Sequence, residues 1–252
     1  MNADRPEKFA AHRSRGLWKN DPMVLELNDC RLRTVNGRWP FEVRHAKAIA
    51  AHWKTAASNN PKLFNGRVFV LRNWSIEHDV LFGEAMPTAF AAYLYWRDTG
   101  FDGGDTAEAF ASSIIVAADG GVLVAKAAAG TLNEEQYVSP GGLLDQRDVT
   151  EDGLIDIAGA AAREIAEEVG LGRLDLTRQP GFRMAMVEPY LALASMLHSP
   201  LSGAALVRRV ADFLSNQAEP ELEAPRIVRS RAELDDINPT RFTRLLSETV
   251  LA

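Results

Sequence analysis

At residues 163–171 the chain reads Arg163-Glu164-Ile165-Ala166-Glu167-Glu168-Val169-Gly170-Leu171. Residues three and four apart on an α-helix are neighbours, so Glu164, Glu167 and Glu168 would share one edge, where like charges repel by about 0.2–0.5 kcal/mol per pair. A divalent cation would reverse that cost, because Mg²⁺ takes oxygen ligands and commonly joins one or two carboxylates to the phosphates of a substrate. The spacing therefore predicts a helix with a cation site along one edge.

The same predicted helix has a second, apolar face. Its core-facing stripe recurs at steps of three and four and comprises Ala158, Ala162, Ile165 and Val169. Gly170 suits the left-handed position that ends a helix, and Arg163 can reach Glu167 one turn later. An ordinary amphipathic surface helix with an Arg/Glu pair would show the same carboxylate spacing, so the spacing alone leaves both interpretations open.

Position for position, residues 163–171 resemble the second half of the Nudix box, Arg-Glu-apolar-any-Glu-Glu-any-Gly-apolar. The resemblance implies an α/β/α sandwich with a mixed sheet that hydrolyses a nucleoside diphosphate linked to another group, with Mg²⁺ or Mn²⁺ held on this helix. It implies Glu164, Glu167 and Glu168 as metal ligands and gives the catalytic roles to Glu164, Glu168 and Arg163. Glu168 or a loop carboxylate would be the base, and Arg163 would orient Glu167 through a charge-assisted hydrogen bond.

The first half of the box departs from the family pattern of Gly, five residues, Glu, seven residues and Arg-Glu. Counting back from Arg163, those positions hold Ile155 and Val149. The plausible glycines are Gly141-Gly142, which let the backbone approach a metal or phosphate closely; Gly142 lies 21 residues before Arg163 instead of 14, so seven extra residues bulge out between them. This insertion holds five acidic candidates for the missing Glu, each otherwise a polar loop residue, namely Asp145, Asp148, Glu151, Asp152 and Asp156.

Other carboxylates and rings are candidates outside the box. The later candidates for the base, each otherwise an ordinary surface residue, are Glu188, Glu221 and Glu223. The aromatic residues of the first hundred positions would form either core or a base-stacking platform; they include Trp39, Trp53, Phe64, Trp74, Tyr93, Tyr95 and Trp96.

Composition and net charge indicate which classes of molecule the protein is expected to bind. The 252 residues are 46% hydrophobic and 25% charged, as in a soluble globular protein. A net charge of −6 without a Lys/Arg-rich face argues against a nucleic-acid partner, so an anionic small-molecule substrate would be met locally. Cys30 is alone and no apolar run approaches the 18 or so residues of a membrane span, so we expect a cytoplasmic protein with no disulfide and no membrane partner. The sequence leaves a homodimer open.

Patterning predicts an α/β chain in three parts. We expect a loosely ordered N-terminus at 1–21, an N-terminal α+β extension at 22–106 and a Nudix hydrolase domain at 107–252. Pro87 is expected in the first turn of a helix. The predicted strands are 24–34, 67–72, 79–82, 111–118, 122–128, 182–187, 191–197 and 226–228. The predicted helices, beside the one that carries the box, are 41–58, 88–98, 202–217 and 239–251.

A broader resemblance is to the Nudix branch that hydrolyses UDP-glucose and UDP-galactose. It is carried by Pro61–Gly66 ahead of Leu71-Arg72, by Phe82-Gly83 before an aromatic-rich helix, and by the lengthened box. It implies UMP and a sugar 1-phosphate as products. The basic residues expected to hold the diphosphate are Lys62, Arg67 and Arg72. A CoA or ADP-ribose diphosphatase is the alternative, and a catalytically weak nucleotide sensor is the alternative from another class, favoured by the disrupted first half of the box.

Overall fold

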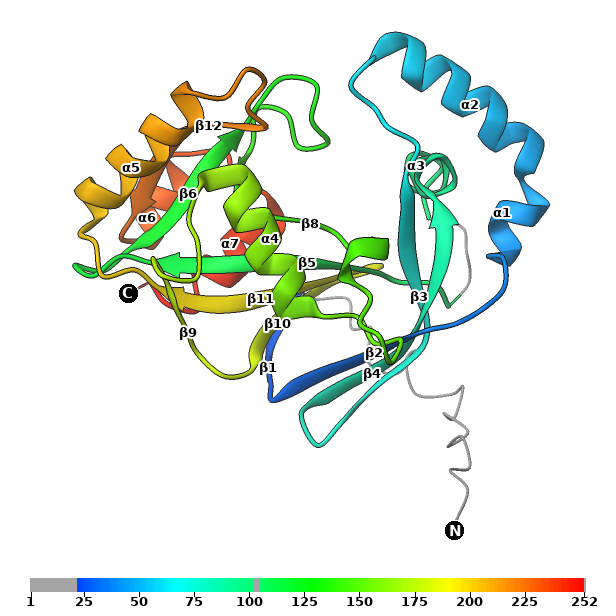
Figure 1. Ribbon diagram of the computed structural model, residues 1–252, viewed down its shortest axis with the longest axis horizontal. Helices are drawn as coiled ribbons and strands as arrows, with labels where there is room; N and C mark the ends of the chain where they lie inside the picture. The colour runs from blue at the N-terminus through cyan, green and yellow to red at the C-terminus, as the bar shows by residue number, and fades with distance from the viewer. Residues whose placement is uncertain (1–21, 102–104, 252) are drawn as a thin grey trace.

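The computed structural model describes residues 22–101 and 105–251, and within them the strands form two sheets (Figure 1). The larger sheet has the order β1 (Met23–Leu27), β10 (Phe182–Val187), β11 (Tyr190–His198), β5 (Glu108–Val116), β6 (Val122–Ala127) and β12 (Leu222–Val228). Three short strands pair with β6, β5 and β11 in turn: β7 (Tyr137–Val138), β8 (Gly141–Leu143) and β9 (Thr177–Arg178). Because β5 and β11 run parallel while β10 and β11 run antiparallel, the sheet is mixed, as predicted.

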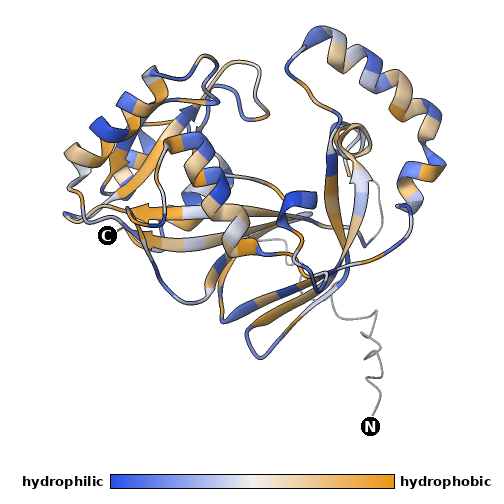
Figure 2. Ribbon diagram, in the orientation of Figure 1, coloured by the Kyte–Doolittle hydropathy of each residue, from blue (hydrophilic) through white to orange (hydrophobic). Residues whose placement is uncertain are grey.

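Helices cover both faces of this sheet. On one face lie α4 (Ile157–Val169) and α5 (Gly203–Ser215), and on the other lie α6 (Arg231–Asp235) and α7 (Arg241–Ser247). Successive side chains of a strand point to opposite faces, so Ile115 of β5 packs in the layer of α4 and α5, whereas Ile114 packs in that of α6 and α7. Figure 2 shows β5 and β11 as largely apolar, as strands covered on both faces should be. The predicted α/β/α sandwich is confirmed.

The smaller sheet has the order β2 (Asp29–Thr34), β4 (Val80–Ala89) and β3 (Arg67–Glu77). Three helices accompany it: α1 (Pro40–Arg44), α2 (Ala46–Asn59) and α3 (Phe90–Asp98). Trp39 and Trp96 meet edge to face in their shared core, with ring centroids 5.4 Å apart. An α+β unit therefore forms in the N-terminal part of the chain (Figure 1).

The predicted strand 24–34 is wrong, because it is two strands. β1 pairs with β10 in the larger sheet and β2 pairs with β4 in the smaller one. Between them the backbone N–H of Asn28 donates to the carbonyl of Asp79. Alternating apolar residues predict an extended strand, but they do not predict which other strand it pairs with. The division at 106/107 stays a prediction; β1 joins the sheet that lies beyond that boundary, and the predicted segment 1–21 lies outside the described residues.

Several other boundaries also shift. Pro87 lies in β4 instead of a helix, past the last residue that pairs with β2, where proline is tolerated because the strand has lost one neighbour. The helix predicted at 41–58 divides at His45 into α1 and α2. Of the segment 239–251, residues 241–247 are helical, and α6 was missed because it spans barely more than one turn. None of the described helices is long and apolar enough to span a bilayer.

The buried stripe of α4 is rotated from the prediction. Ile165 and Val169 are buried as expected, but Ala158 and Ala162 are only partly so. Burial falls instead on Ile157, Ala160 and Ala161. Ile157 offers more apolar surface than its neighbour Ala158, and burial follows apolar area, so the helix turns the face that begins with Ile157 to the core.

Candidate active site

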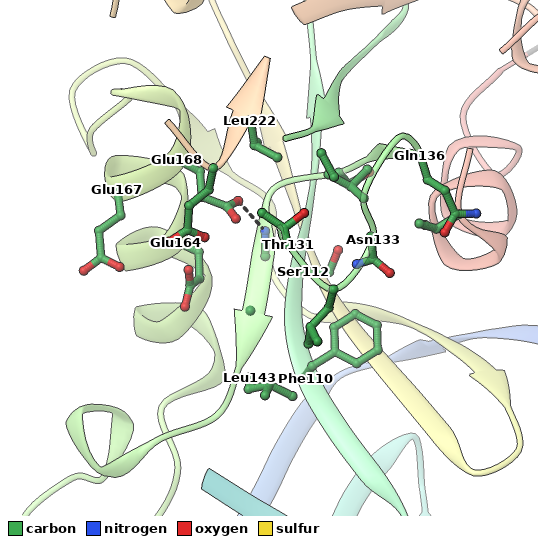
Figure 3. A pocket seen from close by; sticks show the side chains of 18 of the residues that line it. Phe110, Ser112, Thr131, Asn133, Gln136, Leu143, Glu164, Glu167, Glu168 and Leu222 are labelled. Carbon is green, nitrogen blue, oxygen red and sulfur yellow. Dashed lines mark hydrogen bonds between the residues drawn. The ribbon is translucent and has the colours of Figure 1, made fainter. Parts of the chain in front are cut away.

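Helix α4 holds its carboxylates in a defined position because it is capped at both ends. At its start the Asp156 carboxylate accepts a hydrogen bond from the Gly159 N–H at 2.8 Å, an N-cap. At its end Gly170 adopts φ +67°, the left-handed conformation predicted for it. The rotation of α4 then places Glu164 and Glu168 on the side of β8, whereas Glu167 points away and its side chain is 51% exposed (Figure 3).

Glu168 is the most enclosed of the three glutamates, with 9% of its surface exposed. Its Oε2 accepts a hydrogen bond from the backbone N–H of Gly141 at 2.9 Å (Figure 3). Burial, followed by the charges of Glu164 and Glu221, raises the pKa of Glu168 well above its ordinary value. Burial likewise raises the pKa of Glu164. A buried carboxylate beside a partly buried one is costly when both are anions, unless a cation accompanies them.

Gly141 and Gly142 lie so close to neighbouring atoms that a side chain would not fit at either position. A Cβ on Gly142 would lie 2.5 Å from Glu164 Oε1, and one on Gly141 would collide with the backbone of Ala111 on β5. Only glycine lets β8 lie between β5 and the carboxylates of α4 in this way. Gly141 and Gly142 therefore stand where the sequence placed them, against the glutamates of the helix.

Arg163 joins the box helix to the insertion. Its Nη1 lies 2.7 Å from Glu164 Oε1 and 3.2 Å from Glu167 Oε2, so the predicted contact with Glu167 is present. Its Nη2 lies 3.1 Å from Oδ1 of Asp148, whose other carboxylate oxygen accepts the backbone N–H of Asp145 at 2.8 Å. Burial raises the pKa of Asp148. Asp148 is therefore an acid of the insertion that lies directly against the arginine of the box.

The remaining acids of the insertion have other tasks. Asp145 caps the short helix η2 (Gln146–Asp148) and pairs with Arg147 at 2.7 Å. Asp156 caps α4, and the Asp152 carboxylate accepts the Thr150 hydroxyl at 2.5 Å. Glu151 is exposed in the turn. Of the five acids of the insertion, Asp148 hydrogen-bonds to Arg163 at 3.1 Å, whereas Asp145 lies 4.0 Å from the same guanidinium.

The insertion itself is a compact turn held against the smaller sheet. Val149 bridges to Ile155, which is buried at the place where the family pattern puts its Glu. Backbone hydrogen bonds run from Thr34 N to Gly153 O at 2.8 Å and from Ile155 N to Leu32 O at 2.8 Å. The seven extra residues thus extend the contact between the box and β2.

The carboxylates line a cavity of about 850 Å³. It opens where the larger sheet divides: of the described residues, Val116 and Val122 join β5 to β6, after which β5 pairs with β8 and β6 with β7. Strands of the larger sheet line it together with α3 of the N-terminal unit, and the lining includes residues of β5, α4, the loop 129–133 and the start of α7. Figure 3 shows Glu164 and Glu168 on one side of this space and Phe110 of β5 facing it.

A magnesium or manganese ion fits two of the three predicted ligands. Among the described residues, no group of three or more His, Cys, Asp or Glu side chains is arranged to hold a metal. Glu167 lines the outer part of the cavity and contacts Arg163 and Arg147 at 3.2 and 3.3 Å. Its side chain is 51% exposed, against 13% for Glu164, which also contacts Arg163. Glu164 and Glu168 remain beside Gly141-Gly142, and Mg²⁺ is commonly held by one or two carboxylates, with waters and phosphates as its other ligands.

Of the three basic residues predicted to hold the diphosphate, one lines the cavity. Lys62 lines the cavity, with its Nζ 3.8 Å from Glu219 Oε2. Arg67 and Arg72 are not among the described residues that line it, and Arg72 instead donates to Glu84 Oε2 at 2.7 Å within the smaller sheet. The cationic residues of the lining that sequence reasoning missed are Arg97, Arg147 and Arg241. Arg147 alone had a signal, its place inside the acidic insertion.

Some of the candidate bases and aromatic residues named from the sequence line the cavity, and others do not. Glu221 lines the cavity, Glu223 pairs with Lys126 at 3.4 Å, and Glu188 is exposed in the turn after β10. Phe64 is 82% exposed at the cavity wall. The rings buried in the core are Trp39, Trp74, Tyr93 and Trp96, of which Tyr93 also reaches the cavity. Further rings of the lining, missed in the sequence, are Phe90, Phe110, Tyr190 and Phe242.

No family model matches the chain, and no curated protein matches its sequence. Solved structures do match it. They include the Nudix hydrolase RenU of M. smegmatis, with a TM-score of 0.37, 15% identity and a match that covers 57% of this chain and 81% of that chain. A putative Nudix hydrolase family member from Chromobacterium violaceum has a TM-score of 0.36 and 20% identity, over 57% and 75% of the two chains. An Ap4A hydrolase of C. elegans has a TM-score of 0.38 and 16% identity, over 56% and 93%. Two of these three solved structures are described as Nudix hydrolases, one of them putative, and the third as an Ap4A hydrolase.

Proposed function

We propose that the chain hydrolyses the diphosphate of a nucleoside diphosphate linked to another group, with the help of a divalent cation held by Glu164 and Glu168. The observation that carries the proposal is the convergence of the buried Glu168 and the partly buried Glu164 on Gly141-Gly142 at the wall of a cavity. A diphosphate is anionic and the two carboxylates are too, so a cation between them is the natural link. Mg²⁺ or Mn²⁺ would neutralise phosphate charge and lower the pKa of a bound water.

The side chains around the carboxylates position them. Arg163 holds Glu164 and Glu167 by hydrogen bonds and is itself held by Asp148. A charged, bidentate guanidinium fixes carboxylate orientation more firmly than a neutral donor. Groups that orient metal ligands typically change metal affinity or activity by 10- to 100-fold when removed. Arg163 and Asp148 are therefore positioning residues in this proposal.

Two carboxylates compete for the role of base. Glu168 lies beside the glycine pair and its pKa is raised, so it accepts a proton more readily than an exposed glutamate would. Glu221 precedes β12, lines the same cavity and contributes to the raised pKa of Glu164 and Glu168. The proposal gives Glu168 a ligand role and keeps Glu221 as the loop carboxylate that activates water.

For the substrate we propose a UDP-sugar, cleaved to UMP and a sugar 1-phosphate, with a CoA or ADP-ribose derivative as the alternative. The resemblance through Pro61–Gly66 supports the first choice. So does the cavity wall, since Lys62, Phe64 and Arg97 of the N-terminal part contribute to it. The contact of Asp148 with Arg163 favours an enzyme over a weak sensor, because it restores an acid opposite the box arginine.

A substrate screen tests this function. UDP-glucose, CoA, ADP-ribose and deoxynucleoside triphosphates are incubated with Mg²⁺, and the phosphate products are resolved by chromatography. We expect UMP and glucose 1-phosphate from UDP-glucose, and no product when EDTA removes the metal. Efficient cleavage of CoA or ADP-ribose alone would show that the proposed substrate is wrong and the proposed reaction is right. No cleavage of any diphosphate would overturn the proposal.

A further inference from the structure

The cavity contains a buried carboxyl group that the hydrolysis does not use. Glu108 is the first residue of β5, is 3% exposed and lines the cavity. The Tyr93 side chain hydrogen-bonds to it. Its Oε2 is buried and has no hydrogen-bond partner among the described residues. Buried polar atoms in folded proteins nearly always have partners, so an orphan oxygen inside a cavity calls for one from a ligand.

Aromatic rings from three separate elements line the cavity together with this carboxyl group. Along β5, Glu108 and Phe110 share one face because they are two residues apart. Tyr190 of β11 pairs with Glu108 in the sheet register. Phe242, near the start of α7, lies against both rings, with centroids 5.2 Å from Phe110 and 5.5 Å from Tyr190. All four residues line the same cavity as the glutamates of α4.

This chemistry suits one part of a nucleotide. A diphosphate would avoid a carboxyl group, and a sugar would ask for several hydrogen-bond partners around its hydroxyls. A flat heterocycle offers a π-face to aromatic rings and a few polar atoms at its edge. We propose that Glu108, Phe110, Tyr190 and Phe242 form the pocket for the nucleobase of the substrate, with the free Oε2 of Glu108 hydrogen-bonded to the polar edge of the base. The pocket rests on the proposed function only in taking the ring to belong to a nucleotide.

The test separates the base from the phosphate. Nucleoside monophosphates have no anhydride to hydrolyse, so their binding can be measured by calorimetry in the presence of Mg²⁺ without turnover. UMP, GMP, AMP and CMP are compared with ribose 5-phosphate and glucose 1-phosphate, which lack a base. We expect at least one monophosphate to bind tenfold or more tightly than ribose 5-phosphate.

Variants of Glu108 then locate the base. Glu108→Leu fills similar space without a polar atom and should abolish most of that tenfold preference, while ribose 5-phosphate binds as before. Glu108→Gln keeps a hydrogen-bonding edge and should rescue part of it. Glu26→Leu makes the same change at an exposed residue of β1 and should have no effect. Circular dichroism confirms the fold of each variant.

The outcomes distinguish this pocket from the proposed function. Glu108-dependent binding of a monophosphate without hydrolysis of any diphosphate would uphold the pocket and overturn the function. Hydrolysis with monophosphate affinities that are equal in the wild type and Glu108→Leu would overturn the pocket and keep the function. Loss of glucose 1-phosphate binding instead would mean that the pocket takes the sugar, and no binding of any monophosphate would also overturn the proposal.

Discussion

Arg163 Nη2 lies 3.1 Å from Asp148 Oδ1, fifteen residues earlier in the chain. The same guanidinium contacts Glu164 and Glu167 through Nη1, so Arg163 links Asp148 to two of the three box glutamates. Asp148 is buried and its charge is offset mainly by this arginine and by the Asp145 N–H. Removing the charge of Asp148 should therefore leave the partly buried guanidinium of Arg163 less well compensated and the helix carboxylates less well oriented.

Asp148→Asn should lower activity by about 10- to 100-fold, the usual effect of losing a group that orients metal ligands. The Mg²⁺ concentration that gives half-maximal rate should rise, which a merely structural defect would not cause, and Asp148→Glu should restore part of the rate. Asp152→Asn and Glu151→Gln are the controls, since neither residue contacts Arg163 in the structure described. A loss confined to one of these controls would show that another acid supports the box.

Glu168→Gln keeps the shape of the side chain and removes its charge. Turnover should fall by about a hundredfold or more, as losses of metal or base groups typically do. The hydrogen bond from the Gly141 N–H can be kept by the amide oxygen, so the fold should survive, as circular dichroism would show. An unchanged rate at saturating Mg²⁺ would contradict the role given to this residue.

Gly142→Ala tests the close approach of β8 to the helix. Its Cβ would lie 2.5 Å from Glu164 Oε1, so the carboxylate must move. We expect a rate loss of about tenfold or more, since small misplacements of reacting groups are costly, with a small change in melting temperature. Gly172→Ala is the matched control, because the nearest atom to a Cβ there is 3.8 Å away. Equal rates for the two variants would mean that Glu164 is not held in place by Gly142.

Lys62→Ala and Arg72→Ala should differ. Lys62 lines the cavity, whereas Arg72 donates to Glu84 in the smaller sheet. If Lys62 holds substrate phosphate equally in the ground state and the transition state, its loss raises KM with little change in kcat. Arg72→Ala should leave KM unchanged. Steady-state kinetics on UDP-glucose, or on the substrate that the screen identifies, measures both, and a raised KM in Arg72→Ala alone would reverse the assignment.

Glu108 should make stability depend on pH. Burial raises its pKa from 4.5 to about 8 in the folded state. Between these values the folded protein holds a proton that the unfolded chain has lost, so the free energy of unfolding falls as pH rises, by up to about 1.4 kcal/mol per pH unit from this group. Urea unfolding at pH 5, 6.5 and 8 should therefore show a steeper decline for the wild type than for Glu108→Gln. Parallel declines would show that Glu108 ionises normally.

The box helix and its end could be predicted from sequence because both are local. Glu164, Glu168 and Gly170 lie within seven residues, and helical spacing fixes their relation. Asp148 could not be chosen among five acids, because the choice depends on how the insertion packs against β2, far away in the chain. The surroundings of Glu108 were equally hidden, since Tyr93, Tyr190 and Phe242 come from distant parts of the sequence. Arg67 and Arg72 were predicted to hold the diphosphate because of the resemblance. In the structure they lie in β3, paired with β4, and do not line the cavity.

The turn 150–154 ties together parts of the molecule that would otherwise be independent. It leads from Asp148 to the start of α4. The Gly153 carbonyl in the turn accepts the backbone N–H of Thr34, and the N–H of Ile155, just after the turn, donates to the Leu32 carbonyl of β2. Arg33 adds a hydrogen bond to the carbonyl of Asp152 at 3.0 Å. The lengthened box and β2 therefore support each other: shortening the turn would remove the hydrogen bonds on the edge of β2 that faces away from β4, and removing β2 would loosen the segment that leads into α4. Any engineered reduction of this chain has to remove both or neither.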